Sequence, residues 1–492
     1  MSKAKNAKTR VDLPLSKDPF LGYDTIEDAL ADYRCSTGAE VMSRLLRREN
    51  VFVSGPAGSG KTTIINKFIA HIEENTDANV ALTASTGIAA NLIGGRTIHS
   101  WAGLGVSTEP FDKDDISPFA WARAKEMRSA DVLIIDEISM LPAYLFTKLD
   151  ETLKYFRRSK KPFGGLQVIL MGDFLQLPPV NRDNSIDASF AITTKSWNDL
   201  DLSYCYMDKT HRATDPRLSE ILVKISHDKV DSKVREMIQT RLRVSTDSKK
   251  TYTTLFTRNK NVDKYNLEKQ NENRNKLIHF HSISEGKGED VDKLHKNNAI
   301  PHTLSLKVDD IVILTANITD HDDFYPNGSV GRIVSINKAS VSVRFNDGTT
   351  YTVGRKSYYL EEEFKMTVAT QEGEKQIRQK RTLASVEQVP LKLGYAITVH
   401  KSQGQTFDGV IVDLSNCFTA GLGYVALSRV RSLDDLVILD IDDKAYAIDP
   451  KSKVISKYVK RQALEGRKVF EEKLEEYTNI LVNNITLYVF WN

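Results

Sequence analysis

Between residue 51 and about residue 180, short apolar runs alternate with longer segments of helix-compatible composition. The runs are Val51–Val53, Val80–Leu82, Val132–Ile135 and Val168–Leu170. Runs of this length are typical of buried strands, and their alternation with helices indicates a parallel α/β sheet. Helices are predicted to begin at Thr62 and near Gly87, so functional loops should lie at the carboxyl ends of the strands.

The C-terminal part repeats this pattern after a β-rich interval. Val410–Asp413 and Leu436–Ile441 predict a second α/β unit, so two cores with a cleft between them are the simplest architecture. The interval contains β-type runs at Leu306–Leu314, Gly331–Ile336, Val341–Phe345 and Thr350–Val353. Asn346-Asp347-Gly348 between the last two is a strong hairpin-turn signal, so residues 300 to 388 are predicted to form a small β-barrel-like insertion. The charged stretch at 361–382 is assigned no regular structure.

The composition is that of a folded, water-soluble protein. The 492 residues exceed the size at which a single core keeps growing, and no apolar stretch is long enough to cross a bilayer. The net charge of +3 leaves the partner open, and the basic run at 154–161 is either a phosphate-facing groove or a solvated face. The 3 cysteines are far apart and lack metal-ligand spacing, which favours a reducing compartment. The cytoplasm of a bacterial or phage-infected cell is expected, and a nuclear or mitochondrial location stays open.

The most specific chemical signal is the segment from Gly55 to Thr62, which reads Gly-Pro-Ala-Gly-Ser-Gly-Lys-Thr. It is a complete phosphate-binding loop directly after a predicted strand. The glycines let consecutive backbone N–H groups surround a polyphosphate. Lys61 can reach the outer phosphates, and the Thr62 hydroxyl is placed to bind Mg²⁺.

Two adjacent acids, Asp136 and Glu137, end the third predicted strand. After a phosphate loop, Asp136 can hold Mg²⁺, usually through water, and Glu137 can accept a proton from the water that attacks the γ-phosphate. Acids also end strands for purely structural reasons, but the complete loop upstream favours the catalytic interpretation.

Three further groups are candidates for contact with the transferring phosphoryl. Gln176 lies in a sharply turning loop, Gly172–Pro179, that could face the γ-phosphate. Arg212 and Arg429 could neutralise charge on the transferring group. An isolated arginine is more often a surface residue. The sequence motifs around Arg212 and Arg429 are therefore needed to decide whether either residue contacts the phosphoryl group.

The ordered set of motifs resembles a superfamily 1 DNA helicase of the Pif (petite integration frequency) and RecD-like branch. The matching segments are Gly55–Thr62, Thr83–Ala90, Thr97–Ser100, Asp136–Met140, Gly172–Pro179, Val399–Thr406 and Tyr424–Arg429. Pro162–Gln167 is similar to the signature that separates Pif-type enzymes from other members of the superfamily. The resemblance covers about residues 50 to 445.

The resemblance implies an α/β fold of two RecA-like P-loop NTPase cores with a small, SH3-like β-barrel insertion in the second. The expected parts are a basic, flexible N-terminal arm at 1–35, a first core at 36–200 with an insertion at about 103–128, the start of the second core at 201–300, the β-barrel insertion at 301–388 and the rest of the second core at 389–450. A C-terminal amphipathic helix is expected at 451–492, where Phe470, Leu474, Tyr477 and Leu481 have helical spacing.

The resemblance also implies one ATP site between the two cores. Lys61, Glu137, Gln176, Arg212 and Arg429 would be catalytic, and Thr62 and Asp136 would bind Mg²⁺. The nucleotide would contact Gly55, Ala57, Gly58, Ser59, Gly60, Lys61, Thr62, Thr63 and Gly404. The sequence departs from the family pattern at three places. Relatives carry a Gln that reads adenine in the neighbourhood of Thr37–Glu40, and Gln is common at the positions of Leu422 and Ala213. The first departure leaves adenine selectivity open, and neither of the other two removes a charge that hydrolysis needs.

A single DNA strand would cross the tops of both cores. The implied contacts are Thr83, Ser85, Thr86 and His99 in the first core and His400 and Ser402 in the second. Such short polar groups position phosphates without reading sequence. For His99 the alternative is a histidine packed beside Trp101 in the core. Relatives carry a strand-separating pin at the position of 103–128, although no hairpin pattern is present there.

The expected activity is that of an ATP-dependent DNA helicase moving 5′ to 3′ on single-stranded DNA in replication, recombination or repair. Expected cofactors are ATP and Mg²⁺. Expected partners are single-stranded DNA and single-strand/duplex junctions, with single-strand-binding or replication proteins as further candidates, no membrane, and a monomeric state. The alternative is a DNA-stimulated ATPase switch or assembly subunit that separates no strands. A small-molecule kinase would leave Val399–Thr406 and Tyr424–Arg429 unexplained.

Overall fold

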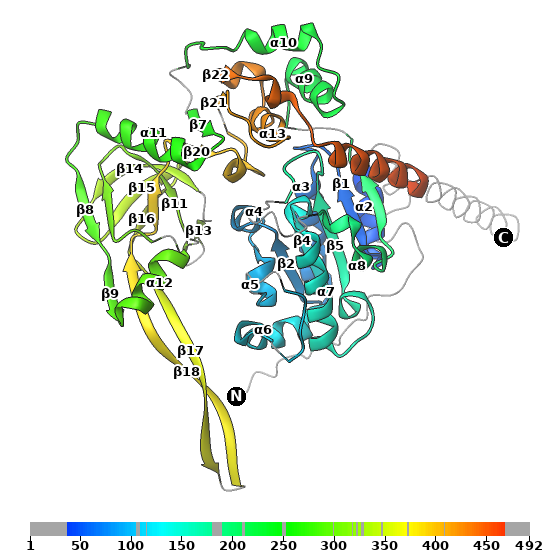
Figure 1. Cartoon of the computed structure of the whole chain (residues 1–492), viewed down its shortest axis with the longest axis vertical. Coiled ribbons are helices and arrows are strands. Elements are labelled where there is room, and N and C mark those ends of the chain that lie inside the picture. The colour runs from blue at the N-terminus through cyan, green and yellow to red at the C-terminus, as the bar shows by residue number, and fades with distance from the viewer. Residues whose placement is uncertain are drawn as a thin grey trace, which may run out of the picture. The chain divides into compact units, whose positions relative to one another are not determined.

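A computed structural model provides the fold (Figure 1). It describes residues 37–104, 109–114, 116–179, 189–208, 212–247, 252–298, 300–316, 318–320, 323–325, 329–345, 348–370, 373–407 and 409–467. The chain divides into two compact units, residues 1–251 with 402–492 and residues 252–401. Within the described ranges, no helix is both long enough and apolar enough to span a membrane.

The first unit contains a parallel sheet with the strand order β3-β2-β4-β5-β1-β6. Its strands are β1 (Val51–Ser54), β2 (Val80–Ala84), β3 (Arg96–Thr97), β4 (Val132–Asp136), β5 (Gln167–Gly172) and β6 (Ser203–Tyr206). The four strands predicted for this region are confirmed. The predicted boundary at residue 200 is wrong, because β6 pairs with β1 and completes the same sheet.

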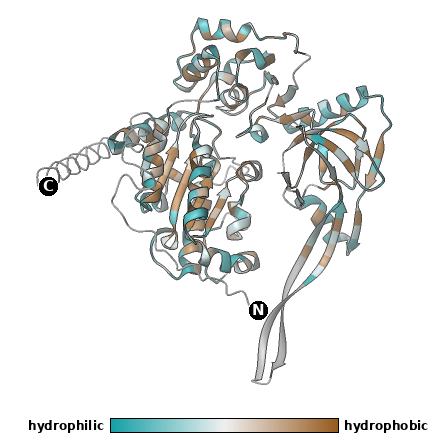
Figure 2. Ribbon diagram, turned by 180° about the vertical axis from the view of Figure 1, so that it is seen from behind, coloured by the Kyte–Doolittle hydropathy of each residue, from teal (hydrophilic) through white to brown (hydrophobic). Residues whose placement is uncertain are grey.

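Both faces of the central strands β1, β4 and β5 are buried, and for this reason these strands read as nearly unbroken apolar runs. Val51 and Val53 point into one core and Phe52 into the other. Helices α2 (Thr37–Leu46) and α3 (Lys61–Asn75) cover the first of these faces. The other is covered by α5 (Ile98–Ala102), α6 (Pro118–Ser129), α7 (Ala143–Arg157) and Val459 of the helical residues 450–467. Figure 2 shows apolar strands enclosed by helices with hydrophilic outer sides.

Short elements connect the layers of this core. They are α4 (Gly87–Leu92), η1 (Ile138–Met140), η2 (Pro162–Gly165), η3 (Ala191–Thr193) and α8 (Lys195–Asn198). The predicted helix starts at Thr62 and Gly87 agree with α3 and α4 to within one residue.

The remainder of the first unit comes from both sides of residues 252–401. It comprises α9 (Pro216–Ser226), α10 (Ser232–Gln239), β21 (Gly409–Leu414), α13 (Leu422–Leu427), η5 (Leu433–Asp435), β22 (Leu436–Ile441) and η6 (Asp443–Tyr446). β21 and β22 pair in parallel, which confirms the two strands predicted near the C-terminus.

The second unit is mainly β-structure. A five-stranded antiparallel sheet has the order β16-β15-β14-β11-β19. Its strands are β11 (Ile311–Leu314), β14 (Val330–Ile336), β15 (Val341–Phe345), β16 (Thr350–Val353) and β19 (Leu391–Leu393). Val312, Ile333, Val343 and Leu391 are among the residues of its core. The predicted β-rich interval is therefore confirmed, although the sheet takes its last strand from beyond residue 388.

This unit also contains elements outside that sheet. They are β7 (Tyr252–Phe256), α11 (Asn259–Glu272), β8 (Ile278–His281), β9 (Ile283–Gly286), α12 (Gly288–Asn298), β10 (Thr303–Leu306), β12 (Ile318–Asp320), β13 (Asp323–Tyr325), β20 (Ala396–Thr398) and the short η4 (His400–Ser402). The run predicted as one strand at Leu306–Leu314 is two strands, β10 and β11. Buried Asp310 forms the turn between them, where its carboxylate accepts hydrogen bonds from the Lys307 backbone and from Gln270.

Residues 361–382 belong to a long hairpin of β17 (Lys356–Thr370) and β18 (Gly373–Gln388). The assignment of no regular structure to this stretch is therefore wrong. A two-stranded ladder satisfies the backbone through cross-strand hydrogen bonds, so it does not require the apolar periodicity that was missing. The helix predicted from Phe470 to Leu481 lies outside the described residues.

Candidate active site

The phosphate loop connects β1 to α3, as the motif predicts. In this structure the Lys61 ammonium donates to the Gly55 carbonyl at 2.7 Å and to the Pro56 carbonyl at 3.1 Å. Gly58 has a φ of +78°, and a Cβ atom there would lie 2.1 Å from the Arg212 Cβ atom. Only glycine satisfies both conditions, so this position of the motif brings the loop against Arg212.

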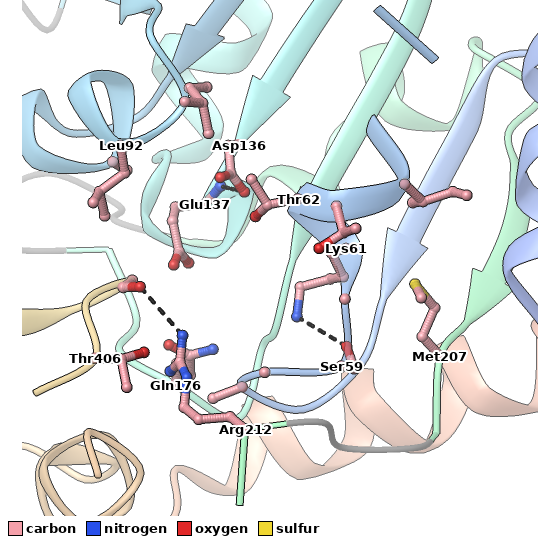
Figure 3. A pocket seen from close by; sticks show the side chains of 18 of the residues that line it. Ser59, Lys61, Thr62, Leu92, Asp136, Glu137, Gln176, Met207, Arg212 and Thr406 are labelled. Atoms are coloured by element: carbon pink, nitrogen blue, oxygen red, sulfur yellow. Dashed lines mark hydrogen bonds between the residues drawn. The ribbon is translucent and has the colours of Figure 1, made fainter. Parts of the chain in front are cut away.

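A cavity of about 760 Å³ opens in front of the loop (Figure 3). It brings together most residues predicted for the ATP site: Ala57, Gly58, Ser59, Gly60, Lys61, Thr62, Thr63, Asp136, Glu137, Gln176, Arg212, Gly404 and Arg429. Gly55 is outside the lining, and its carbonyl instead accepts from Lys61. In Figure 3, Lys61 and Thr62 come from the start of α3, whereas Asp136 and Glu137 come from the end of β4.

The acid pair lies at the point where β4 leaves the sheet. Glu137 has a left-handed φ of 52°, and its N–H donates to Asp136 Oδ1 at 2.8 Å. Gln403 Nε2 donates to Glu137 Oε2 at 2.9 Å. Burial, together with the neighbouring charge of Glu137, raises the pKa of Asp136 to about 7. Burial also raises the pKa of Glu137, against the opposing effect of Lys61. Two carboxylates in one desolvated site favour a bound cation.

The two arginines are held differently. Arg429 is fully buried, and its guanidinium donates to the carbonyls of Val425, Ser402 and Gln405 and to the Ser428 hydroxyl. Burial, followed by the positive charge of Arg212, lowers its pKa to about 9. Among the described residues, Arg212 makes two long hydrogen bonds, to the Ser428 carbonyl at 3.4 Å and the Gly404 carbonyl at 3.3 Å. Arg212 can therefore reorient at smaller cost.

Gln176 follows β5 and is buried in the wall of the cavity. Its Nε2 atom donates to Asp173 Oδ2 at 3.3 Å, so a carboxylate from the same loop fixes the orientation of the amide. The predicted loop geometry, with an amide facing the cavity, agrees with the structure.

Two of the predicted DNA contacts disagree with the structure. The Thr83 side chain has no exposed surface, and its hydroxyl donates to the Ile134 carbonyl at 2.7 Å within the sheet. Ser402 is likewise fully buried. The prediction that these two side chains contact DNA is therefore wrong for this structure. A polar residue at a strand end or in a motif can be buried and hydrogen-bonded inside the core.

The other four candidates retain accessible surface. The Ser85 hydroxyl donates to the Glu137 carbonyl at 2.8 Å, and the Thr86 hydroxyl accepts from the Ala89 N–H at 3.2 Å at the start of α4. His99 in the first unit and His400 in the second are half-buried, and burial lowers the pKa of each ring.

The region predicted to hold a strand-separating pin contains α6. Trp101, at 3% exposure, belongs to the core beside this helix. Trp121 of α6 packs edge-on against Phe156 of α7, with ring centroids 5.1 Å apart. Trp121 thus anchors α6 to the core, whereas Phe119 of the same helix is 71% exposed.

Several cavity residues were not predicted. Met207, Thr214, Thr406 and Arg431 line it, as does Gly38 of α2. Arg431 lies two residues after Arg429 and could have been found from that spacing, whereas no local signal distinguishes Met207. Glu40, near the expected adenine-reading position, is occupied by ion pairs with Arg44 and Arg467.

A phosphate loop, a strand-terminal acid pair and two arginines around one cavity define a P-loop nucleoside-triphosphatase core. Comparison with known proteins identifies the family to which this core belongs. The family model of PIF1-like helicases matches residues 40–238, and that of the UvrD-like helicase C-terminal domain matches residues 393–433.

Full-length relatives extend the match. The ATP-dependent DNA helicase Pif1 of Psychrobacter sp. (strain PRwf-1) is 33% identical over 480 residues, covering 88% of this chain and 72% of the relative. The ATP-dependent DNA helicase Pif1 of Bdellovibrio bacteriovorus is 33% identical over 420 residues, covering 84% of this chain and 89% of the relative. The chain therefore belongs to the PIF1-like helicase family.

Solved structures agree with this assignment. The crystal structure of Pif1 helicase from Candida albicans has a TM-score of 0.74 and 27% identity, covering 86% of this chain and 98% of that one. The crystal structure of Bacteroides Pif1 bound to single-stranded DNA has a TM-score of 0.69 and 28% identity. The match covers 85% of this chain and 95% of that one. These structures support an architecture with two RecA-like cores.

Proposed function

We propose that the cavity hydrolyses ATP and that this hydrolysis moves the protein along single-stranded DNA and unwinds duplex DNA. The observation that carries the proposal is the convergence of Lys61, the acid pair and both arginines on one cavity of nucleotide size. Family membership supports the coupling to DNA, and a Bacteroides Pif1 structure contains ADP-AlF3 together with single-stranded DNA.

In the proposed reaction, the oxygen of a water molecule attacks the γ-phosphorus while the bond from that phosphorus to the bridging oxygen of ADP breaks. Glu137 accepts the proton that the water loses. Lys61, Arg212 and Arg429 neutralise negative charge on the transferring phosphoryl group. This electrostatic effect matters most, because phosphoryl transfer leaves the protein little covalent chemistry to perform. Gln176, which also lines the cavity, orients the water or the γ-phosphate.

The donor set fits Mg²⁺. The Thr62 hydroxyl and the Asp136 carboxylate line the same cavity, and both are hard oxygen ligands of the kind that this ion prefers. Burial and the neighbouring charge of Glu137 raise the pKa of Asp136, and a bound cation would offset both effects. Held by Thr62 and Asp136, Mg²⁺ would supply positive charge that offsets the negative charge of the triphosphate.

We further propose movement in the 5′ to 3′ direction, action at single-strand/duplex junctions as a monomer, and a role in replication, recombination or repair. Ser85, Thr86, His99 and His400 remain the candidate DNA contacts. The five-stranded sheet of the second unit is proposed to be the SH3-like insertion. Cys205 and Cys417 are free and buried, which supports a reducing compartment.

The decisive measurement is ATP turnover with and without single-stranded DNA. Lys61→Ala is expected to lower turnover by at least about 10³-fold, because it removes positive charge from the outer phosphates. Lys195→Ala is the matched control, since that side chain is 87% exposed and lies outside the cavity. DNA-independent turnover in the wild type, or turnover that survives Lys61→Ala, would refute the proposal.

Strand separation and polarity need a second substrate pair. Unwinding of a 5′-tailed duplex should exceed unwinding of a 3′-tailed duplex of the same sequence. The reverse preference would refute the direction only. DNA-stimulated hydrolysis without displacement of either duplex would instead support an ATPase switch or assembly subunit.

A further inference from the structure

One short segment, Ser402–Gln405, contacts three of the groups that the proposed reaction requires. The carbonyls of Ser402 and Gln405 both accept from Arg429 Nη1, at 3.1 Å and 3.3 Å. The Gly404 carbonyl accepts from Arg212 Nη2 at 3.3 Å. The Gln403 side chain donates to Glu137. Consecutive residues therefore connect the proposed base to both arginines.

The contact between Gln403 and Glu137 is buried and has one orientation. Gln403 is 4% exposed and Glu137 is 9% exposed. An ionised carboxylate only accepts hydrogen bonds, so the amide nitrogen must face Glu137 Oε2, which lies 2.9 Å away. Among the described residues, Gln403 Oε1 has no hydrogen-bond partner. The side chain is thus dedicated to Glu137.

The backbone on each side brings the two residues to this distance. Glu137 adopts a left-handed conformation, and its carbonyl accepts from Ser85 Oγ. Gly404, next to Gln403, has a φ of +80°, and a Cβ atom there would lie 2.9 Å from Leu92 Cδ1. Glycine adopts this left-handed conformation without strain, whereas a larger residue would destabilise the turn that presents Gln403.

A general base must present an oxygen to the attacking water in a fixed direction. Without a partner, the Glu137 side chain could rotate towards Lys61 or the arginines, since all three cations share its cavity. A neutral amide donor restrains the carboxylate without adding another cation.

We propose that Gln403 is a positioning residue for ATP hydrolysis: its amide N–H holds Glu137 by Oε2, which leaves Oε1 to receive the proton of the attacking water. The proposal rests on the function proposed above and adds no reacting group. The oxygen–phosphorus bond forms, the bridging bond to ADP breaks, and the proton passes to Glu137 as before.

Gln403→Met tests this directly, because methionine keeps the side-chain length and removes both polar atoms. We expect kcat of the DNA-stimulated ATPase to fall by about 10²-fold, a typical effect of losing oriented acid–base catalysis. The dissociation constant of ADP should change by less than about twofold, since the lost interaction acts on hydrolysis and not on ground-state binding. Affinity for ADP–aluminium fluoride should fall with kcat.

Gln403→Glu is the second variant and Gln239→Met on exposed α10 is the control. Glutamate keeps the shape but repels Glu137, so kcat should fall at least as far as in Gln403→Met.

A kcat of Gln403→Met within about threefold of the kcat of the control overturns the positioning role. Equal losses of ADP affinity and kcat also overturn it, because they indicate structural damage. An inactive wild type would overturn the proposed function itself, whereas an active wild type beside an active Gln403→Met overturns only the role of Gln403.

Discussion

At the scale of single residues, burial distinguishes groups that sequence motifs treat as equivalent. Arg212 and Arg429 were both candidates for charge neutralisation, and both reach the cavity. Arg429 is also a structural residue, because its fully buried guanidinium satisfies three backbone carbonyls. Burial also distinguishes Thr83 and Ser402 from the other predicted DNA contacts. Both side chains were expected on the surface, and both lie in the interior.

This difference predicts separable effects of the two alanine substitutions. Arg212→Ala and Arg429→Ala should each lower ATP turnover by about 10³-fold or more. Arg429→Ala should additionally lower the free energy of unfolding by about 3 kcal/mol or more, since it leaves several buried carbonyls unpaired. Arg212→Ala should change it by less than about 1 kcal/mol, because its hydrogen bonds are long. Urea unfolding of both variants measures this, and equal destabilisation would contradict the assignment.

At the scale of elements, α9 is held by its N-terminal cap. The Asp215 carboxylate accepts from the Arg217 N–H at 2.9 Å and from the Arg217 guanidinium at 2.8 Å. It also accepts from the Ser432 hydroxyl and the Leu433 N–H, both at 3.1 Å. One carboxylate therefore caps α9 and connects it to the start of η5, on a segment 217 residues later in the chain.

Asp215→Ala should lower the free energy of unfolding at pH 7 by about 1–2 kcal/mol, as for other N-caps. The Arg217 guanidinium and the backbone N–H donors hold the pKa of Asp215 well below its usual range. A carboxylate with a lowered folded-state pKa stabilises the fold above its unfolded pKa, and this stabilisation is lost as the pH falls towards the folded pKa.

The difference between wild type and Asp215→Ala should therefore be full at pH 6 and smaller at pH 3. Denaturant unfolding at both pH values measures it. Asp292→Ala, on the exposed surface of α12, should show little difference from the wild type at either pH. A difference for Asp215→Ala that grows towards pH 3 would contradict the cap.

At the scale of the whole molecule, the C-terminal helical residues 450–467 complete the first core. Val459 is fully buried in the main cluster of that core, and Lys460 lies over the ring of Tyr206 at 4.8 Å. Arg467 Nε donates to Glu40 Oε2 on α2 at 3.2 Å. A segment more than 400 positions from α2 in the sequence thus stabilises the core that carries the phosphate loop.

Val459→Asp should therefore lower the free energy of unfolding by about 3 kcal/mol or more, because it places an unpaired charge in an apolar core. Val454→Asp is the matched control on the same helical segment, since Val454 is 69% exposed. Thermal unfolding of the two variants compares them. Equal midpoints would show that the segment does not contribute to the core.

Local sequence determined the positions of four first-core strands, the phosphate loop and the acid pair. Each of these depends on neighbours in the chain: Val51–Val53 is apolar because both sheet faces are covered, and Gly55–Thr62 encodes its own turn. The family resemblance then supplied the proposed roles of Arg212 and Arg429, which spacing alone had left undecided.

Tertiary structure decided what depends on distant partners. It showed that β6 completes the first sheet, that charged residues 361–382 form a paired hairpin, and that Thr83 and Ser402 are buried. It also placed the Gln403 amide on Glu137, 266 positions away. No local pattern contains such contacts, because side-chain burial and hydrogen-bond partners are set by whichever segments the fold brings together.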